Sequence, residues 1–107
     1  MAALTAFSAG LAAELGPKNI RVNTVSPGPT RTAMWESPEG LGGQVAAALG
    51  VPIEAIVAGA LEPVGMLTGR LSEPHEVADL ITFLLSDRAG NITGADYLID
   101  GGALRTA

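Results

Sequence analysis

The sequence has no cysteine and only one lysine, one histidine and one tyrosine in 107 residues. Without cysteine the chain can form no disulfide and offers no thiolate, and one histidine cannot build a zinc site of the usual His/Cys kind, so we expect no metal. Six basic residues against eleven acidic ones leave a net charge of −5, which excludes the basic patch that nucleic-acid binding requires. The absence of cysteine fits a cytoplasmic protein.

Long apolar runs are missing as well. The sequence contains no run of about 18 uninterrupted apolar residues, so it predicts no membrane-spanning helix. The opening residues, MAALTAFSAGLAA, have no Lys or Arg before their apolar part, so we expect neither a signal peptide nor a membrane partner. What the chain does have is a composition with 48% hydrophobic and 16% charged residues, which is typical of one small globular domain over residues 1–107.

Two segments have the apolar periodicity of helices. Residues 2–15 carry apolar side chains at three- and four-residue spacing, and Gly16 and Pro17 then end the predicted helix. A second helix is predicted to begin at Pro74, because Ser72 and Glu73 supply a cap and a favourable first-turn charge. Its expected buried face consists of Val77, Leu80, Ile81, Leu84 and Leu85.

Two short runs rich in β-branched or aromatic residues predict strands. The predicted strands are residues 20–25 and residues 95–99. We expect the first of them to be buried on both faces. Residues 33–71 lie between them and contain two alanine-rich stretches, near 44–49 and 53–61, that predict short helices. Strands separated by helices indicate an α/β fold with a parallel pair, a piece of a doubly wound sheet with two strands and about four helices. Such a pair leaves a strand edge open to another segment or chain.

The loop after the first strand, SPGPTRT, is the candidate binding site. Ligands of open α/β sheets bind beyond the carboxyl ends of the strands, so we select Pro27, Gly28, Thr30 and Thr32. Proline fixes the backbone and removes a donor, and glycine allows close approach of a ligand. The same residues are common in a tight turn with an N-cap, and residue chemistry alone leaves both interpretations open. Arg31 is interpreted as a solvated charge.

Three blocks of sequence resemble the C-terminal part of the short-chain dehydrogenases/reductases. In chain order they are AGLAAELGPKNIRVNTVSPGPTRT, GRLSEPHEVADLITFLLSD and ITGADYLIDGG. The resemblance implies the C-terminal portion of a Rossmann-type domain. It also implies an oxidoreductase that moves a hydride between NAD or NADP and a small carbonyl or alcohol substrate. Members of this family are expected to form homo-oligomers.

The resemblance also assigns roles within the loop. Pro27 and Gly28 would form one wall for the nicotinamide, the backbone of Thr30 would bind its carboxamide, and the Thr32 hydroxyl would reach the carboxamide or the pyrophosphate. Residues 34–66 resemble the substrate lid, in which Met34 and Trp35 would line an apolar pocket; ordinary core packing is the alternative. Asp100-Gly101-Gly102 resembles the end of the family's last strand, near the substrate; a plain strand-ending turn is the alternative.

The catalytic Tyr-x-x-x-Lys pair of that family has no counterpart in this sequence. Tyr97 is followed four residues later by Gly101, and Lys18 lies in a turn. Laid on the family helix, Met1 occupies the place of the catalytic lysine, so we expect no catalytic residue here and no activity of the isolated chain. His75, in the first turn of a predicted helix, is no substitute.

The glycine cluster at residues 40–43 is expected to be a loop, because it neither follows a strand nor completes a phosphate-binding spacing. Two other interpretations of the whole chain stay open. It could be a non-catalytic interaction or oligomerisation module that offers its open strand edge to itself or to a longer relative, or a gene remnant. The residues do not distinguish NAD from NADP and do not identify the substrate.

Overall fold

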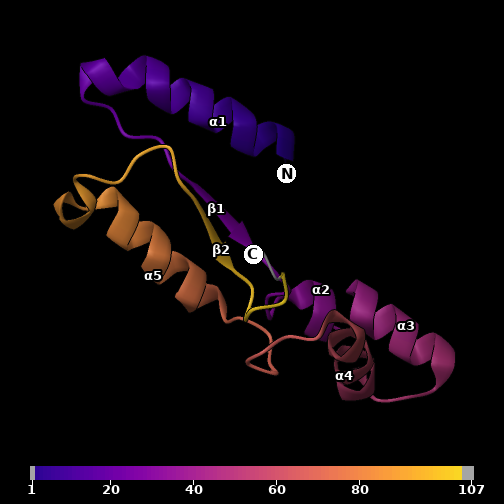
Figure 1. Cartoon of the computed structure of the whole chain (residues 1–107). Coiled ribbons are helices and arrows are strands. Elements are labelled where there is room, and N and C mark those ends of the chain that lie inside the picture. Colours follow the sequence, from indigo (N-terminus) through magenta and orange to yellow (C-terminus); the bar gives the residue numbers. More distant parts are fainter. Residues whose placement is uncertain (1, 105–107) are drawn as a thin grey trace. The chain divides into compact units, whose positions relative to one another are not determined.

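The computed structural model describes residues 2–104, apart from the side chain of Pro63 (Figure 1). Its elements are α1 (Ala2–Leu15), β1 (Thr24–Pro27), α2 (Ala33–Glu36), α3 (Leu41–Leu49), α4 (Ile53–Val64), α5 (Pro74–Leu85) and β2 (Asp96–Ile99), with 3-10 turns at Gly16–Lys18 and Asp87–Ala89. The chain divides into two compact units. One holds the described residues up to Pro27 together with His75–Ile99, and the other holds Gly28–Pro74 and the described residues from Asp100 onward.

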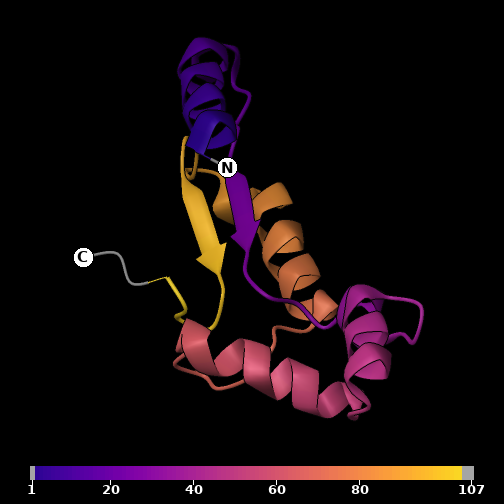
Figure 2. The same cartoon turned by 90° about the vertical axis from the view of Figure 1, so that its right-hand side faces the viewer.

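The first unit is built on a parallel pair of strands. Thr24 lies opposite Asp96, and the register continues to Pro27 opposite Ile99. Figures 1 and 2 show α1 and α5 on opposite faces of this pair. The predicted α/β fold with two parallel strands is therefore confirmed, and so are the bounds of α1 and the start of α5 at Pro74.

The first strand begins later than the sequence predicts. Residues 20–23 are not part of the ladder, because they bond to the loop before β2 largely through side chains. The Val22 N–H donates to Thr93 Oγ1 at 3.1 Å, and the Val22 carbonyl accepts from the Gly94 N–H at 2.8 Å. The Asn23 side-chain amide donates to the Ile92 carbonyl at 2.9 Å and accepts from the Ala95 N–H at 3.2 Å, in place of backbone-to-backbone bonds. Although helices lie on both faces of the pair, the β1 residues are only half-buried or exposed, so the strand is less buried than the sequence predicts.

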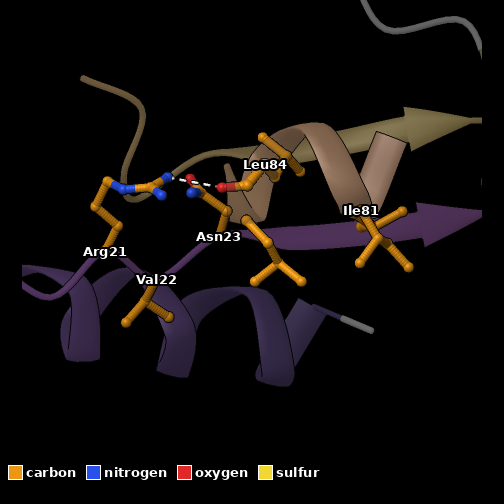
Figure 3. Close-up of a pocket in the computed structure, with 7 residues that line it drawn as sticks. Arg21, Val22, Asn23, Ile81 and Leu84 are labelled. Carbon is orange, nitrogen blue, oxygen red and sulfur yellow. Dashed lines mark hydrogen bonds between the residues drawn. The ribbon is translucent and has the colours of Figure 1, made fainter. Parts of the chain in front are cut away.

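Arg21 closes the end of α5. Its guanidinium donates to the carbonyl of Leu84 at 2.8 Å (Figure 3). It also donates to the carbonyl of Ser86 at 3.3 Å. The last carbonyls of a helix have no partner within the helix and carry partial negative charge, so a cation there satisfies both needs. The side chain thereby fixes α5 to the segment that leads into β1.

The predicted buried face of α5 is only partly covered. Leu84 is buried, but Ile81 is 42% and Leu85 is 78% exposed. A hollow of about 490 Å³ borders these side chains in the first unit (Figure 3). It is lined by Arg21, Val22, Asn23, Val25, Ile81, Leu84 and Leu85. The prediction that this whole face of α5 is buried is therefore wrong, because no other described element of the first unit fills the hollow.

The second unit contains three helices where the sequence predicted two. The additional one, α2, is a single turn, and α3 begins at Leu41, inside the glycine cluster that was expected to be a loop. Gly42 and Gly43 are buried in α3, and a Cβ on Gly43 would lie 2.5 Å from the Pro38 Cα. These glycines therefore let the start of α3 pack against the backbone that follows α2.

No single helix within residues 2–104 has both the length and the hydropathy to cross a membrane. Taken together, the bent pair Ala33–Leu49 and Ile53–Glu62 meets that measure across a 101° bend.

Candidate functional site

The candidate loop begins where β1 ends. Pro27 is the last strand residue, and Gly28 opens the second unit. A Cβ built on Gly28 would lie 2.5 Å from the Asp100 Cβ and 2.9 Å from the Asp100 Cα. Sequence reasoning explained this glycine by the approach of a flat ligand ring. The structure supplies a reason within the chain itself, which is the close passage of the segment that follows β2.

Asp100 organises that segment. One carboxylate oxygen accepts from the Gly102 N–H at 2.9 Å, and the other accepts from the Leu104 N–H at 2.9 Å. Gly101 and Gly102 have φ of 63° and 83°, a conformation that favours glycine. The Gly101 carbonyl accepts from the Thr68 N–H at 3.1 Å. Asp100-Gly101-Gly102 is thus a strand-ending turn, and it is bonded to the chain between α4 and α5.

Thr30 lies in an isolated parallel bridge with Ser72. The Arg31 N–H donates to the Ser72 carbonyl at 2.8 Å, and the Ser72 N–H donates to the Pro29 carbonyl at 3.1 Å. Because successive peptide groups of an extended chain point in opposite directions, the N–H and C=O of Thr30 itself face away from Ser72. Neither has a hydrogen-bond partner within the part of the chain that the structure describes. Thr30 therefore offers a free donor and a free acceptor side by side.

The two threonine hydroxyls differ. Thr30 Oγ1 donates to the Gly28 carbonyl at 2.9 Å, so this hydroxyl stabilises the loop. Thr32 is the N-cap of α2, and its carbonyl accepts from the Trp35 and Glu36 N–H groups at 3.0 and 3.1 Å. Its hydroxyl nevertheless makes no capping hydrogen bond. Of the two hydroxyls, the one at Thr32 is exposed and available to a ligand.

Arg31 is an exposed charge, as the sequence indicated, with 42% of its side chain accessible, but it is also paired with two carboxylates. Its Nε donates to Glu73 Oε1 at 2.9 Å, and its Nη1 donates to Glu36 Oε1. Hydrogen bonds to Glu36 and Glu73 hold the pKa of the Arg31 guanidinium above its ordinary value. Sequence reasoning missed this network because Glu73 is 42 positions away along the chain, and no local pattern connects it to Arg31.

A hollow of about 480 Å³ lies in the second unit, in the region expected to form a lid. Ile53, Val57 and Leu61 of α4 contribute its apolar wall, and Arg31 and Glu36 contribute charge. Met34 and Trp35, which were expected to line an apolar pocket, do not line this one. Met34 is 50% exposed, and the Trp35 backbone packs against the start of α3.

The remaining acid/base candidates do not form a cluster. Tyr97 lies in β2 and Lys18 in the 3-10 turn after α1, whereas Met1 is outside the described residues. His75 is exposed in the first turn of α5. Across residues 2–104 no group of three or more His, Cys, Asp or Glu side chains could hold a metal ion.

Comparisons with known proteins agree on one family. A family model described as enoyl-(acyl carrier protein) reductase matches residues 1–103. A 2,3-dihydro-2,3-dihydroxybenzoate dehydrogenase of Bacillus subtilis is 36% identical over 108 residues, which cover 95% of this chain and 37% of that protein. A 3alpha-hydroxysteroid dehydrogenase of Mediterraneibacter gnavus is 38% identical over 101 residues, covering 94% of this chain and 34% of that protein.

Solved structures give the same result. L-sorbose reductase from Gluconobacter frateurii, complexed with NADPH and L-sorbose, matches 99% of this chain and 39% of its own with a TM-score of 0.89 and 32% identity. An NADPH-bound short chain oxidoreductase from Pseudomonas aeruginosa matches 99% of this chain and 37% of its own with a TM-score of 0.79 and 26% identity.

The chain thus spans between a third and two fifths of the length of these relatives. The model match covers nearly all of its residues, and the two parallel strands with helices on both faces have the architecture of the C-terminal portion of a Rossmann-type fold. The chain belongs to the short-chain dehydrogenase/reductase family.

Proposed function

We propose that this chain is the C-terminal portion of an NAD(P)-dependent short-chain oxidoreductase that interconverts a carbonyl and an alcohol, and that it supplies part of the nicotinamide pocket and the substrate lid. The observation that carries the proposal is the free N–H and C=O of Thr30. A carboxamide has both an acceptor oxygen and donor N–H groups, so it complements this pair. The NADPH named in the structures of two similar proteins supports the same cofactor class.

The other loop residues fit this use. Bound NAD(P) would supply the hydride donor or acceptor. Pro27 has no N–H to leave unpaired and presents a rigid surface to the ring, and Gly28 keeps that surface free of a side chain. The exposed Thr32 hydroxyl can donate to the carboxamide or to the pyrophosphate. Together these groups would fix which face of the nicotinamide is presented.

The proposal includes a limit on activity. Hydride transfer to a carbonyl requires a proton donor at the carbonyl oxygen, held sufficiently acidic. The family resemblance assigns this role to a tyrosine and a lysine four residues later, and the sequence contains no such pair. We therefore expect no turnover by the isolated chain.

A kinetic experiment tests both parts. The purified chain is mixed with NADH or NADPH and a set of small ketones, and no oxidation above a mock preparation is expected; robust turnover would overturn the limit. In the complete enzyme, whether a longer chain or this chain combined with the complementary part of a relative, Thr32→Ala should raise the cofactor KM. Thr82→Ala is the matched control, because among residues 2–104 that hydroxyl bonds only the Ala78 carbonyl within α5. An unchanged KM for Thr32→Ala would reject the assigned role.

The second candidate is an interaction module that associates through the open edge of β1, either with itself or with a longer relative. The hollow beside β1 and the exposed Ile81 and Leu85 favour it, because such surfaces are stabilised by a partner. Sedimentation velocity over a hundredfold range of concentration tests it. A size that rises with concentration supports this candidate, and a monomer at the highest concentration rejects self-association.

A further inference from the structure

Arg31 lies between the two threonines of the candidate loop, yet its side chain bonds to carboxylates from two other segments of the second unit. Its Nε donates to Glu73 Oε1 at 2.9 Å and its Nη1 donates to Glu36 Oε1. Glu36 is the last residue of α2, and Glu73 stands immediately before α5. One guanidinium therefore connects the loop to the first helix of the expected lid and to the segment that follows the lid.

A backbone connection lies at the same place. The Arg31 N–H donates to the Ser72 carbonyl at 2.8 Å, and the Ser72 N–H returns to the Pro29 carbonyl at 3.1 Å. Ser72 is 6% exposed and the neighbouring Leu71 is 1% exposed, so the receiving segment is fixed in the core of the second unit. The side-chain bonds and the bridge restrain the same stretch of loop from two directions.

Arginine is suited to this arrangement in a way that lysine is not. The planar guanidinium directs separate N–H groups toward two acceptors at once, whereas an ammonium acts as a single mobile point charge. An isolated exposed ion pair contributes little to stability. Here the three side chains are also 35–43% exposed, so the restraint lies in the geometry of one guanidinium bonded to two carboxylates beside a backbone bridge, and not in the strength of either ion pair.

We propose that Arg31 is a positioning residue, which holds the peptide groups of Thr30 and the hydroxyl of Thr32 in place by clamping the loop to Glu36 and Glu73. The bridge with Ser72 turns the free N–H and C=O of Thr30 to one side. The bond from Arg31 to Glu36 holds α2 against Thr32, its N-cap residue. The effect of Arg31 on cofactor binding rests on the proposed function. The restraint of the loop by Arg31 does not depend on that function.

Hydrogen exchange in the intact chain tests the clamp without any cofactor. The probe is the Ser72 amide, which donates to Pro29. Arg31→Ala should accelerate its exchange by roughly three- to tenfold, the effect expected for losing charged hydrogen bonds that restrain a local opening. Arg31→Glu should do the same, and adding Glu73→Arg to it should restore slow exchange. Arg88→Ala is the control, since the Arg88 side chain has no ion pair among residues 2–104. A wild-type rate in Arg31→Ala would overturn the proposal.

Kinetics of the complete enzyme test the positioning role. Arg31→Ala should raise the cofactor KM several-fold with kcat largely kept, and Arg31→Lys should recover part of the loss. A role in folding alone would lower the yield of active enzyme and leave KM unchanged. If Thr32→Ala raises KM but Arg31→Ala changes neither KM nor Ser72 exchange, the clamp is wrong and the proposed function stands. If Ser72 exchange responds while Thr32→Ala leaves KM unchanged, the clamp stands and the cofactor role fails.

Discussion

Replacing Gly28 by alanine should destabilise the protein even though the change adds one methyl group. The new Cβ would lie 2.5 Å from the Asp100 Cβ and 2.9 Å from its Cα. Ordinary carbon contacts are about 3.5–4.0 Å, so the shortfall is about 1 Å. No rotamer change relieves it, because the Asp100 atoms belong to the backbone or are fixed directly to it. The two segments must move apart.

The magnitude follows from overpacking. Insertions that force backbone shifts cost about 1–3 kcal/mol, and we take about 2 kcal/mol here. With a urea m-value of about 1.5 kcal/mol/M, the unfolding midpoint should fall by about 1.3 M. Far-UV circular dichroism during a urea titration measures it. The m-value should stay the same, because the loss is in folded-state packing and not in the surface exposed on unfolding.

Gly59→Ala is the matched control. A Cβ at Gly59, inside α4, meets no atom within 4 Å. Alanine is favoured over glycine in a helix interior by about 0.5–1 kcal/mol, so this variant should unfold at a higher urea concentration than the wild type. A Gly28→Ala midpoint equal to that of the wild type would refute the argument that Gly28 is required by the passage of Asp100.

Two further predictions concern one polar and one apolar cluster. Hydrogen bonds from Thr24 and Ser26 hold the pKa of the Asp96 carboxyl below its usual range, so its stabilising effect is present above about pH 4 and is lost as the pH falls through the lower folded-state value. Combining Thr24→Val with Ser26→Ala should move the Asp96 titration midpoint, followed by carboxyl chemical shift, to higher pH; an unmoved midpoint contradicts this cause. Leu71 is 1% exposed, so Leu71→Ala should cost about 2–5 kcal/mol in urea unfolding. Leu49→Ala, at a position 66% exposed, should stay within about 0.5 kcal/mol, and equal losses in the two variants would contradict the assigned core.

The long helices could be predicted because their signals are local. The apolar spacing of residues 2–15 and the breakers Gly16 and Pro17 lie within one stretch, and so does the start signal at Pro74. The position of β1 could not be predicted in the same way. Whether residues 20–23 join the ladder depends on Thr93 and on the Asn23 amide group, which bonds to chain about 70 positions away. A β-branched run specifies an extended conformation, but its partner decides whether that conformation is a strand.

The candidate site divides along the same line. The strand-end rule selected the loop at Pro27, and the structure places this loop directly after β1, because the end of a strand follows from adjacent residues. The helix that begins after Thr32 was not predicted. The reason for Gly28 and the bonds of Arg31 depend on Asp100 and Glu73, which only the folded second unit brings near. The close approach at Gly28 and the Arg31–Glu73 ion pair are thus long-range features that local chemistry does not indicate.

This distinction changes how mutations in the loop must be interpreted. A loss of cofactor binding in a Gly28 or Arg31 variant could arise from displacement of the loop, since both residues hold it to other segments. The Thr32 hydroxyl makes no capping bond, so its removal leaves the framework intact. Thr32→Ala is therefore the variant whose kinetic effect reports on the proposed ligand contact, and the Ser72 amide is the probe that reports on the framework. Measuring the two separately decides whether a defect lies in binding or in positioning.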